Sequence, residues 1–196
     1  MSRQQVTKKN EQEFSKFLSF ILRHHPEEIG LSLENNGWIN VGSLIIAINN
    51  HEASKWVIDL DTLEQIVIND NKQRYSFNSS KTKIRANQGH SIKGLVMNFK
   101  EVTTPPEYLY HGTSEANAEL IMQSGMIKPM SRQMVHLSGD LDTAIKVGKR
   151  HGKPVVFKID TEKVQQTDKK IYISENGVYL VDNLSIEFLE LIDITK

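Results

Sequence analysis

The sequence of 196 residues contains no cysteine, which excludes disulfide bonds and thiolate-based zinc sites. It has no apolar run near the roughly 20 residues that a membrane-spanning helix needs. The N-terminal stretch MSRQQVTKKNEQEF also lacks the hydrophobic segment of a secretory signal. We therefore expect a cytoplasmic protein that has no membrane partner.

Charge of one sign is not in excess, since 24 lysines and arginines are balanced by 24 aspartates and glutamates. The net charge of the whole molecule would therefore not drive binding to nucleic acid. The local distribution differs, because residues 72–85 contain basic residues and no acid. Such a stretch is either a solvated hairpin or a surface that contacts phosphates, and from the charges alone both interpretations stay open. Its basic residues are Lys72, Arg74, Lys81, Lys83 and Arg85.

Several familiar ligand sites are missing from the sequence. No G-x-G-x-x-G pattern follows an expected strand, which argues against a Rossmann dinucleotide site, and no Walker loop is present. The cluster of His24, His25, Glu27 and Glu28 matches no standard zinc spacing, so we expect no metal site.

The apolar pattern of residues 11–25 predicts an amphipathic helix that Pro26 would stop. On a helical wheel Arg23 points away from the buried face and His24 lies at its flank, so both can face outward, whereas His25 lies nearer to that face and is expected to pack. Cations suit the C-terminal end of a helix, so this placement has a purely structural explanation as well as a catalytic one. The expected buried positions are Phe14, Phe17, Leu18, Ile21 and Leu22.

The rest of the N-terminal half predicts two further helices and a β-hairpin at 74–77 and 83–86, a combination typical of a winged helix. We assign residues 1–95 to this lobe, 96–106 to a linker and 107–196 to a second, strand-rich lobe. In the second lobe we expect helices at 115–124 and 140–150, and strands at 108–110, 135–137, 154–159, 171–173, 178–181 and 186–192.

Longer segments of the sequence resemble one known family. In chain order they are KFLSFILRHHPEEIGL, NGWINV, KQRYSF, KIRANQGHS, PPEYLYHGTS, VHLS, TAIKVGKRHGKPVVFKID and SENGVYLVDNL. These segments are similar to the NAD-dependent RNA 2'-phosphotransferases, which are called KptA in bacteria. The resemblance runs from about residue 14 to 190. It implies an α+β fold in which an N-terminal winged helix is joined to a C-terminal ADP-ribosyltransferase-like split β-sheet domain.

The resemblance also implies a catalytic set that grips one phosphate. Carried over to this sequence, the set is Arg23 and His24 from LRHHP, Arg74 from KQRYSF and Arg132 from SRQMVHLS. Three of these residues lie in the first lobe and one in the second, so the active site is expected in the cleft between the lobes. The hairpin and the RANQGHS stretch would support the RNA through Lys81, Lys83, Arg85, Gln88 and His90.

By the same resemblance, NAD would bind to the second lobe as a co-substrate. The family pattern places His111, Gly112 and Thr113 at the first motif and His136 at the second, where relatives of the fold often have tyrosine. Val178 stands where that fold often carries a catalytic glutamate, and a phosphate acceptor that is already anionic needs no such base. The remaining candidates for contact with NAD are Ser138, Arg150, Ser174, Asn176 and Gly177.

The implied activity is removal of a 2'-phosphate from RNA by its transfer to NAD. An ADP-ribosylated 2'-phospho-RNA intermediate would give RNA with a 2'-hydroxyl, ADP-ribose 1'',2''-cyclic phosphate and nicotinamide. We expect a monomer that acts in tRNA processing, such as tRNA splicing, or in RNA repair. Two alternatives remain, namely an ADP-ribosyltransferase that modifies terminal phosphates of nucleic acid and a non-catalytic winged-helix sensor of NAD or ADP-ribose.

Overall fold

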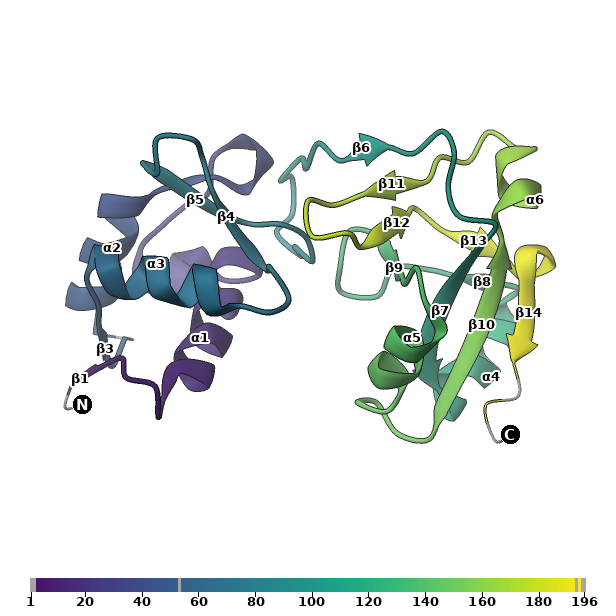
Figure 1. Ribbon diagram of the computed structural model, residues 1–196, viewed down its shortest axis with the longest axis horizontal. Helices are drawn as coiled ribbons and strands as arrows, with labels where there is room; N and C mark the ends of the chain where they lie inside the picture. Colours follow the sequence, from purple (N-terminus) through teal and green to yellow (C-terminus); the bar gives the residue numbers. More distant parts are fainter. Residues whose placement is uncertain (1–2, 53, 193, 195–196) are drawn as a thin grey trace. The chain divides into compact units, whose positions relative to one another are not determined.

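A computed structural model of the chain describes residues 3–52, 54–192 and 194. These residues form a mixed α and β structure that divides into two compact units (Figure 1). We call them the N-terminal unit, Met1–Asn98, and the C-terminal unit, Phe99–Lys196. Each unit has its own hydrophobic core. Within the described residues, no helix is long and apolar enough to cross a membrane.

The N-terminal unit packs three α-helices against a small antiparallel sheet with the strand order β2-β5-β4. Side-chain caps start two of these helices, since Asn40 accepts from the Ser43 amide at 2.9 Å and Asp59 from the Thr62 amide at 2.8 Å. The elements are β1 Gln4–Gln5, α1 Glu11–Arg23, η1 Pro26–Ile29, η2 Asn35–Gly37, β2 Ile39–Asn40, α2 Val41–Asn50, β3 Trp56–Val57, α3 Leu60–Asn69, β4 Tyr75–Phe77 and β5 Lys83–Ala86.

The C-terminal unit contains sheets with the strand orders β14-β10-β7, β6-β11-β12-β9 and β13-β8. The first two meet where Tyr110 and Ser138 exchange backbone hydrogen bonds of 2.9 and 2.8 Å. Helix α5 packs on β7 and β10 (Figure 1). The elements are β6 Lys100–Glu101, β7 Tyr108–Ser114, α4 Glu115–Ser124, β8 Met126–Ile127, β9 Val135–Leu137, α5 Leu141–Gly148, β10 Pro154–Asp160, α6 Thr161–Gln165, β11 Tyr172–Ile173, β12 Tyr179–Val181, β13 Leu184–Ser185, η3 Ile186–Phe188 and β14 Leu189–Ile192.

Three expectations about the C-terminal half differ from the structure. Part of the stretch 96–106, interpreted as a linker, is structured, because Lys100–Glu101 forms β6 and pairs with β11. The strand expected at 186–192 is shorter, because residues 186–188 form a 3-10 turn after the Ser185 cap. In addition, strand β7 extends through His111–Ser114, beyond the strand expected at 108–110.

Candidate active site

The C-terminal end of α1 presents Arg23 and His24. The helix buries the apolar stripe of Phe14, Leu18, Ile21 and Leu22, and Arg23 occupies its last turn. His24 caps the helix, with its amide donating to the Phe20 carbonyl at 3.0 Å. Arg23 and His24 are both half-buried.

His25 is not the packing residue that the helical wheel predicts. It is exposed, because the helix has already ended at Arg23 and the wheel no longer applies. Its ring lies on the exposed Phe20 ring with a centroid distance of 4.8 Å. Its Nδ1 contacts the Glu27 carboxylate at 2.9 Å. The hydrogen bond from its own backbone amide, and then the one with His25, holds the pKa of Glu27 below its usual value.

The segment after β5 returns to the end of α1 and orients both residues. The Ser91 amide donates to the Arg23 carbonyl at 3.0 Å, which satisfies one of the carbonyls left open at a helix end. The Ser91 hydroxyl lies 2.8 Å from Nδ1 of His24. One serine thus fixes the backbone of Arg23 and the ring of His24.

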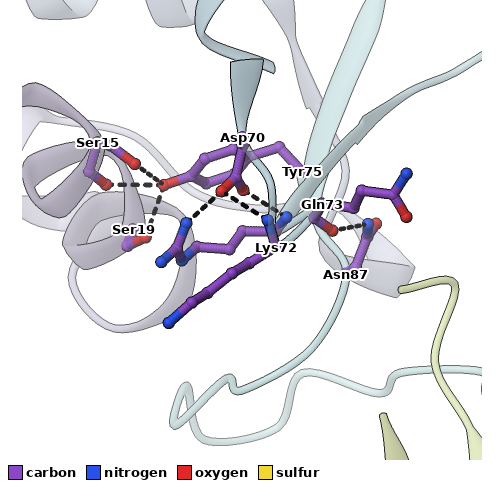
Figure 2. Close-up of polar contacts among 8 residues, drawn as sticks. Ser15, Ser19, Asp70, Lys72, Gln73, Tyr75 and Asn87 are labelled. Atoms are coloured by element: carbon purple, nitrogen blue, oxygen red, sulfur yellow. Dashed lines mark hydrogen bonds and ion pairs between the residues drawn. The ribbon is translucent and has the colours of Figure 1, made fainter. Parts of the chain in front are cut away.

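Arg74 lies in the turn between α3 and β4, where Asp70, which is labelled in Figure 2, holds it. The Asp70 carboxylate forms an ion pair with the Arg74 guanidinium and accepts from the Arg74 amide at 2.6 Å. From the other side, the Asn87 amide donates to the Arg74 carbonyl at 2.8 Å. The side chain of Arg74 is 29% exposed, so ligands from solvent can reach it.

Tyr75 connects the Arg74 turn to helix α1. Its hydroxyl donates to the Ser15 carbonyl at 2.7 Å and lies 2.6 Å from the Ser19 hydroxyl (Figure 2). Ser15, Ser19 and Arg23 are spaced four residues apart and therefore share one face of the helix. Burial raises the pKa of the Tyr75 hydroxyl, while the nearby charges of Arg23 and Arg74 oppose that rise. Arg23, His24 and Arg74 are therefore grouped in the N-terminal unit.

Two of the predicted RNA contacts are buried close to this group. His90 is 2% exposed, and burial and the charges of Arg23, His24 and Arg85 lower its pKa to about 4. Arg85 is 8% exposed, and its guanidinium stacks over the Trp38 ring at 4.5 Å. At this burial both residues shape the interior of the unit, and their predicted contact with RNA stays a prediction.

The predicted RNA contacts on the hairpin are more accessible, but their charges are compensated. Lys81 forms an ion pair with Glu64 at 2.8 Å, and Lys83 forms one with Glu34 at 2.6 Å. Gln88 is half-buried in the segment that follows β5. The hairpin is therefore less positive than its sequence alone indicates.

In the C-terminal unit, the two motif histidines lie on neighbouring strands. The Nδ1 atom of His111 on β7 donates to the His136 carbonyl on β9 at 3.1 Å. Burial lowers the pKa of His111, although this hydrogen bond opposes the shift. Ser138 follows β9 and bonds to Tyr110 through the backbone, so His111, His136 and Ser138 are brought together.

Gly112 has a steric role between the strand and helix α5. A Cβ atom at this position would lie 1.8 Å from the Ala144 carbonyl oxygen, which is far inside contact distance. The neighbouring Thr113 is 5% exposed, and its carbonyl would lie 2.7 Å from a Cβ on Gly148. The close approach of α5 to β7 thus requires glycine on both sides.

The turn between β11 and β12 contains four of the predicted NAD contacts, namely Ser174, Asn176, Gly177 and Val178. The Ser174 hydroxyl donates to Asn176 Oδ1 at 2.8 Å and accepts from the Val178 amide at 3.1 Å. Gly177 adopts a positive φ of 76°, which closes the turn. Ser174 therefore shapes the turn from a buried position, and Val178 is half-buried beside it.

Arg132 and Arg150 are near each other in the C-terminal unit. Partial burial and the positive charge of Arg150 lower the pKa of Arg132. Both side chains keep contact with solvent. Neither forms an ion pair with an acid of residues 3–52, 54–192 or 194. The predicted convergence of Arg132 with Arg23, His24 and Arg74 would join the two units, and it stays a prediction.

Comparison with known proteins places the chain in a family. Residues 9–183 match the RNA 2'-phosphotransferase, Tpt1 / KptA family. The chain belongs to this family. A relative from Trichormus variabilis is 47% identical over 179 residues, which cover 91% of this chain and 95% of the relative. A relative from Fusobacterium nucleatum is 48% identical over 182 residues, which cover 92% and 98%. Both relatives carry the name "Probable RNA 2'-phosphotransferase", that of a transferase.

The structure adds residues that the sequence comparison with the RNA 2'-phosphotransferases did not single out. Asp70 and Asn87 hold Arg74, Ser91 holds His24, and Tyr75 ties β4 to α1. A signal for Asp70 was available, because a carboxylate shortly before an arginine in a turn can bond to the backbone of that turn. The other three act across long sequence separations and have no local signature.

Proposed function

We propose that this protein removes the 2'-phosphate from RNA and transfers it to NAD. The observation that carries the proposal is that Tyr75 connects the turn of Arg74 to the helix that ends in Arg23 and His24, in a chain of the RNA 2'-phosphotransferase family. The products are RNA with a 2'-hydroxyl, ADP-ribose 1'',2''-cyclic phosphate and nicotinamide.

Arg23 and Arg74 supply the positive electrostatic potential that binding of a phosphate needs. The C-terminal end of a helix carries a partial negative charge, so the end of α1 alone would repel a phosphate dianion. Guanidinium groups stay charged, and their planar fork binds phosphate oxygens in pairs. Arg23 and Arg74 therefore convert an unfavourable position into one that binds the dianion.

In the first step, an oxygen of the 2'-phosphate attacks the anomeric carbon of the nicotinamide ribose. The bond to nicotinamide breaks, its electron pair leaves with nicotinamide, and an ADP-ribosylated 2'-phospho-RNA forms. A phosphate monoester is already anionic and needs no base, which agrees with valine at position 178.

In the second step, the ribose 2''-hydroxyl attacks the same phosphorus and releases its proton to solvent, and the bond from phosphorus to the RNA 2'-oxygen breaks. That oxygen takes up a proton as it leaves. We assign the proton to Nε2 of His24, the ring nitrogen opposite the one that Ser91 holds.

The C-terminal unit is assigned to NAD, in an ADP-ribosyltransferase-like arrangement. Its neighbouring Arg132 and Arg150 repel each other, and a bound pyrophosphate would relieve that repulsion, so these side chains fit a dinucleotide. The sheets that meet at Tyr110 and Ser138 support the split-sheet assignment. The order α1-β2-α2-α3-β4-β5 supports a winged helix in the N-terminal unit.

The test is incubation of the protein with a 2'-phosphorylated oligoribonucleotide, with and without NAD, followed by mass analysis of RNA and small products. We expect loss of the phosphate only with NAD, together with the cyclic phosphate of ADP-ribose. The same oligonucleotide with a 2'-hydroxyl is the control. RNA that gains ADP-ribose and reacts no further would favour the ADP-ribosyltransferase alternative, and unchanged RNA would favour the non-catalytic sensor.

A further inference from the structure

We propose that Asp70 is a positioning residue that aims the Arg74 guanidinium at the 2'-phosphate, an inference that rests on the proposed function. Asp70 follows the last turn of α3, and its side chain is only 5% exposed. Its Oδ1 pairs with one terminal nitrogen of the Arg74 guanidinium. Its Oδ2 accepts from the Arg74 amide at 2.6 Å. One carboxylate thus holds both the backbone and the side chain of the same arginine.

The turn around Arg74 is held from two sides. Asp70 also accepts from the Lys72 amide at 3.2 Å, and its carbonyl accepts from the Gln73 amide at 2.7 Å. Asn87 donates from its side chain to the Gln73 carbonyl at 2.7 Å and from its amide to the Arg74 carbonyl. Gln73 adopts a φ of 45°, a left-handed conformation that a non-glycine residue keeps only when its surroundings enforce it. The contacts of Asp70 and Asn87 enforce it here.

The contact with Asp70 leaves part of the Arg74 guanidinium available to a second acceptor, the phosphate. A guanidinium presents several N–H donors in a rigid fork. In the part of the chain that the structure describes, Asp70 is the residue that accepts a hydrogen bond from the Arg74 guanidinium, and it accepts from one terminal nitrogen. The remaining donors can then bind phosphate oxygens, so Arg74 would bridge the carboxylate and the phosphate. Because backbone amides hold the buried carboxylate, the arginine is oriented before the RNA arrives.

An ordinary surface ion pair is the simpler explanation, since exposed pairs at i and i+4 contribute little. The near-complete burial of the carboxylate and its bonds to backbone amides argue against that explanation. The two explanations also predict different kinetics. A fixed negative charge near a phosphate weakens binding of that phosphate, so its loss strengthens binding if orientation is unaffected. A positioning residue is therefore recognised by slower transfer without weaker binding.

The test is a double-mutant cycle of Asp70→Asn and Arg74→Ala in the full-length protein. Single-turnover rates of phosphate loss are measured with a 2'-phosphorylated oligoribonucleotide and NAD, and RNA affinity is measured without NAD. We expect Asp70→Asn to slow transfer by about 10- to 100-fold, as a displaced catalytic group does. We expect affinity for the phosphorylated RNA to be unchanged or higher. In the Arg74→Ala background, Asp70→Asn should cause no further loss.

Glu13→Gln is the matched control, because it removes one carboxylate from an exposed ion pair with Lys55 in the same unit. It should leave both rate and affinity unchanged. Additive losses in the cycle, or a wild-type rate for folded Asp70→Asn, would overturn the inference. If Asp70→Asn does not fold, Asp70→Ser takes its place, because a serine hydroxyl still accepts from backbone amides. A wild-type protein that turns over no phosphorylated RNA contradicts the proposed function itself, and the inference falls with it.

Discussion

The Nδ1 atom of His24 lies 2.8 Å from the Oγ atom of Ser91, and the amide of the same serine donates to the carbonyl of Arg23. Two neighbouring residues of the proposed catalytic set are therefore oriented by one residue that lies 67 positions further along the chain than His24. The ring of His25 faces a different partner, Glu27. This difference between adjacent histidines makes them a natural pair for mutation.

The variant His24→Ala should accumulate the ADP-ribosylated RNA intermediate. Loss of a general acid typically slows its step by about 10²- to 10⁴-fold, and the first step does not need that acid. A time course of RNA species by mass or gel mobility measures the effect. His25→Ala is the control and should stay close to wild type. A His24→Ala protein that stalls before nicotinamide release would contradict the assigned role.

The stability of the protein should depend on pH through His90. Burial and the charges of Arg23, His24 and Arg85 lower the pKa of His90 to about 4, whereas a histidine in an unfolded chain titrates near 6.5. Between these values the unfolded state binds more protons, so stability is present above about pH 6.5 and falls as the pH drops toward 4. The total loss is about 3 kcal/mol.

Urea unfolding at pH 7, 6 and 5 measures this effect. The variant His90→Gln has no titrating ring, so its free energy of unfolding should change less over this range than that of the wild type. The slope between pH values is the relevant quantity, because the substitution itself alters packing against Gly37. An identical slope in both proteins would show that His90 titrates in the folded state as it does in the unfolded state.

The variant Gly112→Ala should destabilise the C-terminal unit by roughly 3 kcal/mol or more, because its Cβ would lie 1.8 Å from the Ala144 carbonyl oxygen. Gly139→Ala is the matched control in the same unit. There a Cβ would approach only the edge of the Tyr179 ring at 3.3 Å, which can shift. Thermal unfolding of the two variants compares them. Equal melting temperatures would mean that α5 is able to move away from β7.

Binding of RNA should respond to the ion pair between Lys83 and Glu34. Lys83→Ala should weaken binding and lower the salt slope by about 0.7 to 0.9, the contribution of one phosphate contact. Glu34→Gln should strengthen binding, because it removes the carboxylate that competes with the phosphate. Titrations at several salt concentrations give both quantities. If neither variant changes the slope, the hairpin is a solvated surface.

The sequence predicts the elements of the N-terminal unit better than its electrostatics. The apolar period correctly predicts a helix that begins near Glu11, because burial of one helix face depends on local spacing, but α1 ends at Arg23, two residues before the expected end at His25. Residues 72–85 contain no acid, yet Glu64 and Glu34 reach Lys81 and Lys83 from other elements. Such compensation depends on tertiary contacts, which a count of charges along the chain does not contain.

In the candidate site too, features that depend on local sequence are predictable, whereas features that depend on tertiary packing are not. The motif around Gly112 suggests contact with NAD, whereas the steric reason for the glycine becomes visible only with α5 packed on β7. The turn at 174–177 is predictable from Asn176-Gly177, since this pair favours a tight turn. The packing of His25 was predicted wrongly, because a helical wheel assumes that the helix continues beyond Arg23.

The hydroxyl of Tyr75, which reaches Ser15 and Ser19, has a consequence for the thermodynamics of ligand capture. This contact fixes the separation of Arg23 and Arg74 when the chain folds. The conformational entropy of ordering the two side chains is therefore lost on folding and not each time a phosphate binds. A rigid spacing also favours one size of anion, and a smaller or larger oxyanion would meet the same two groups at the wrong separation.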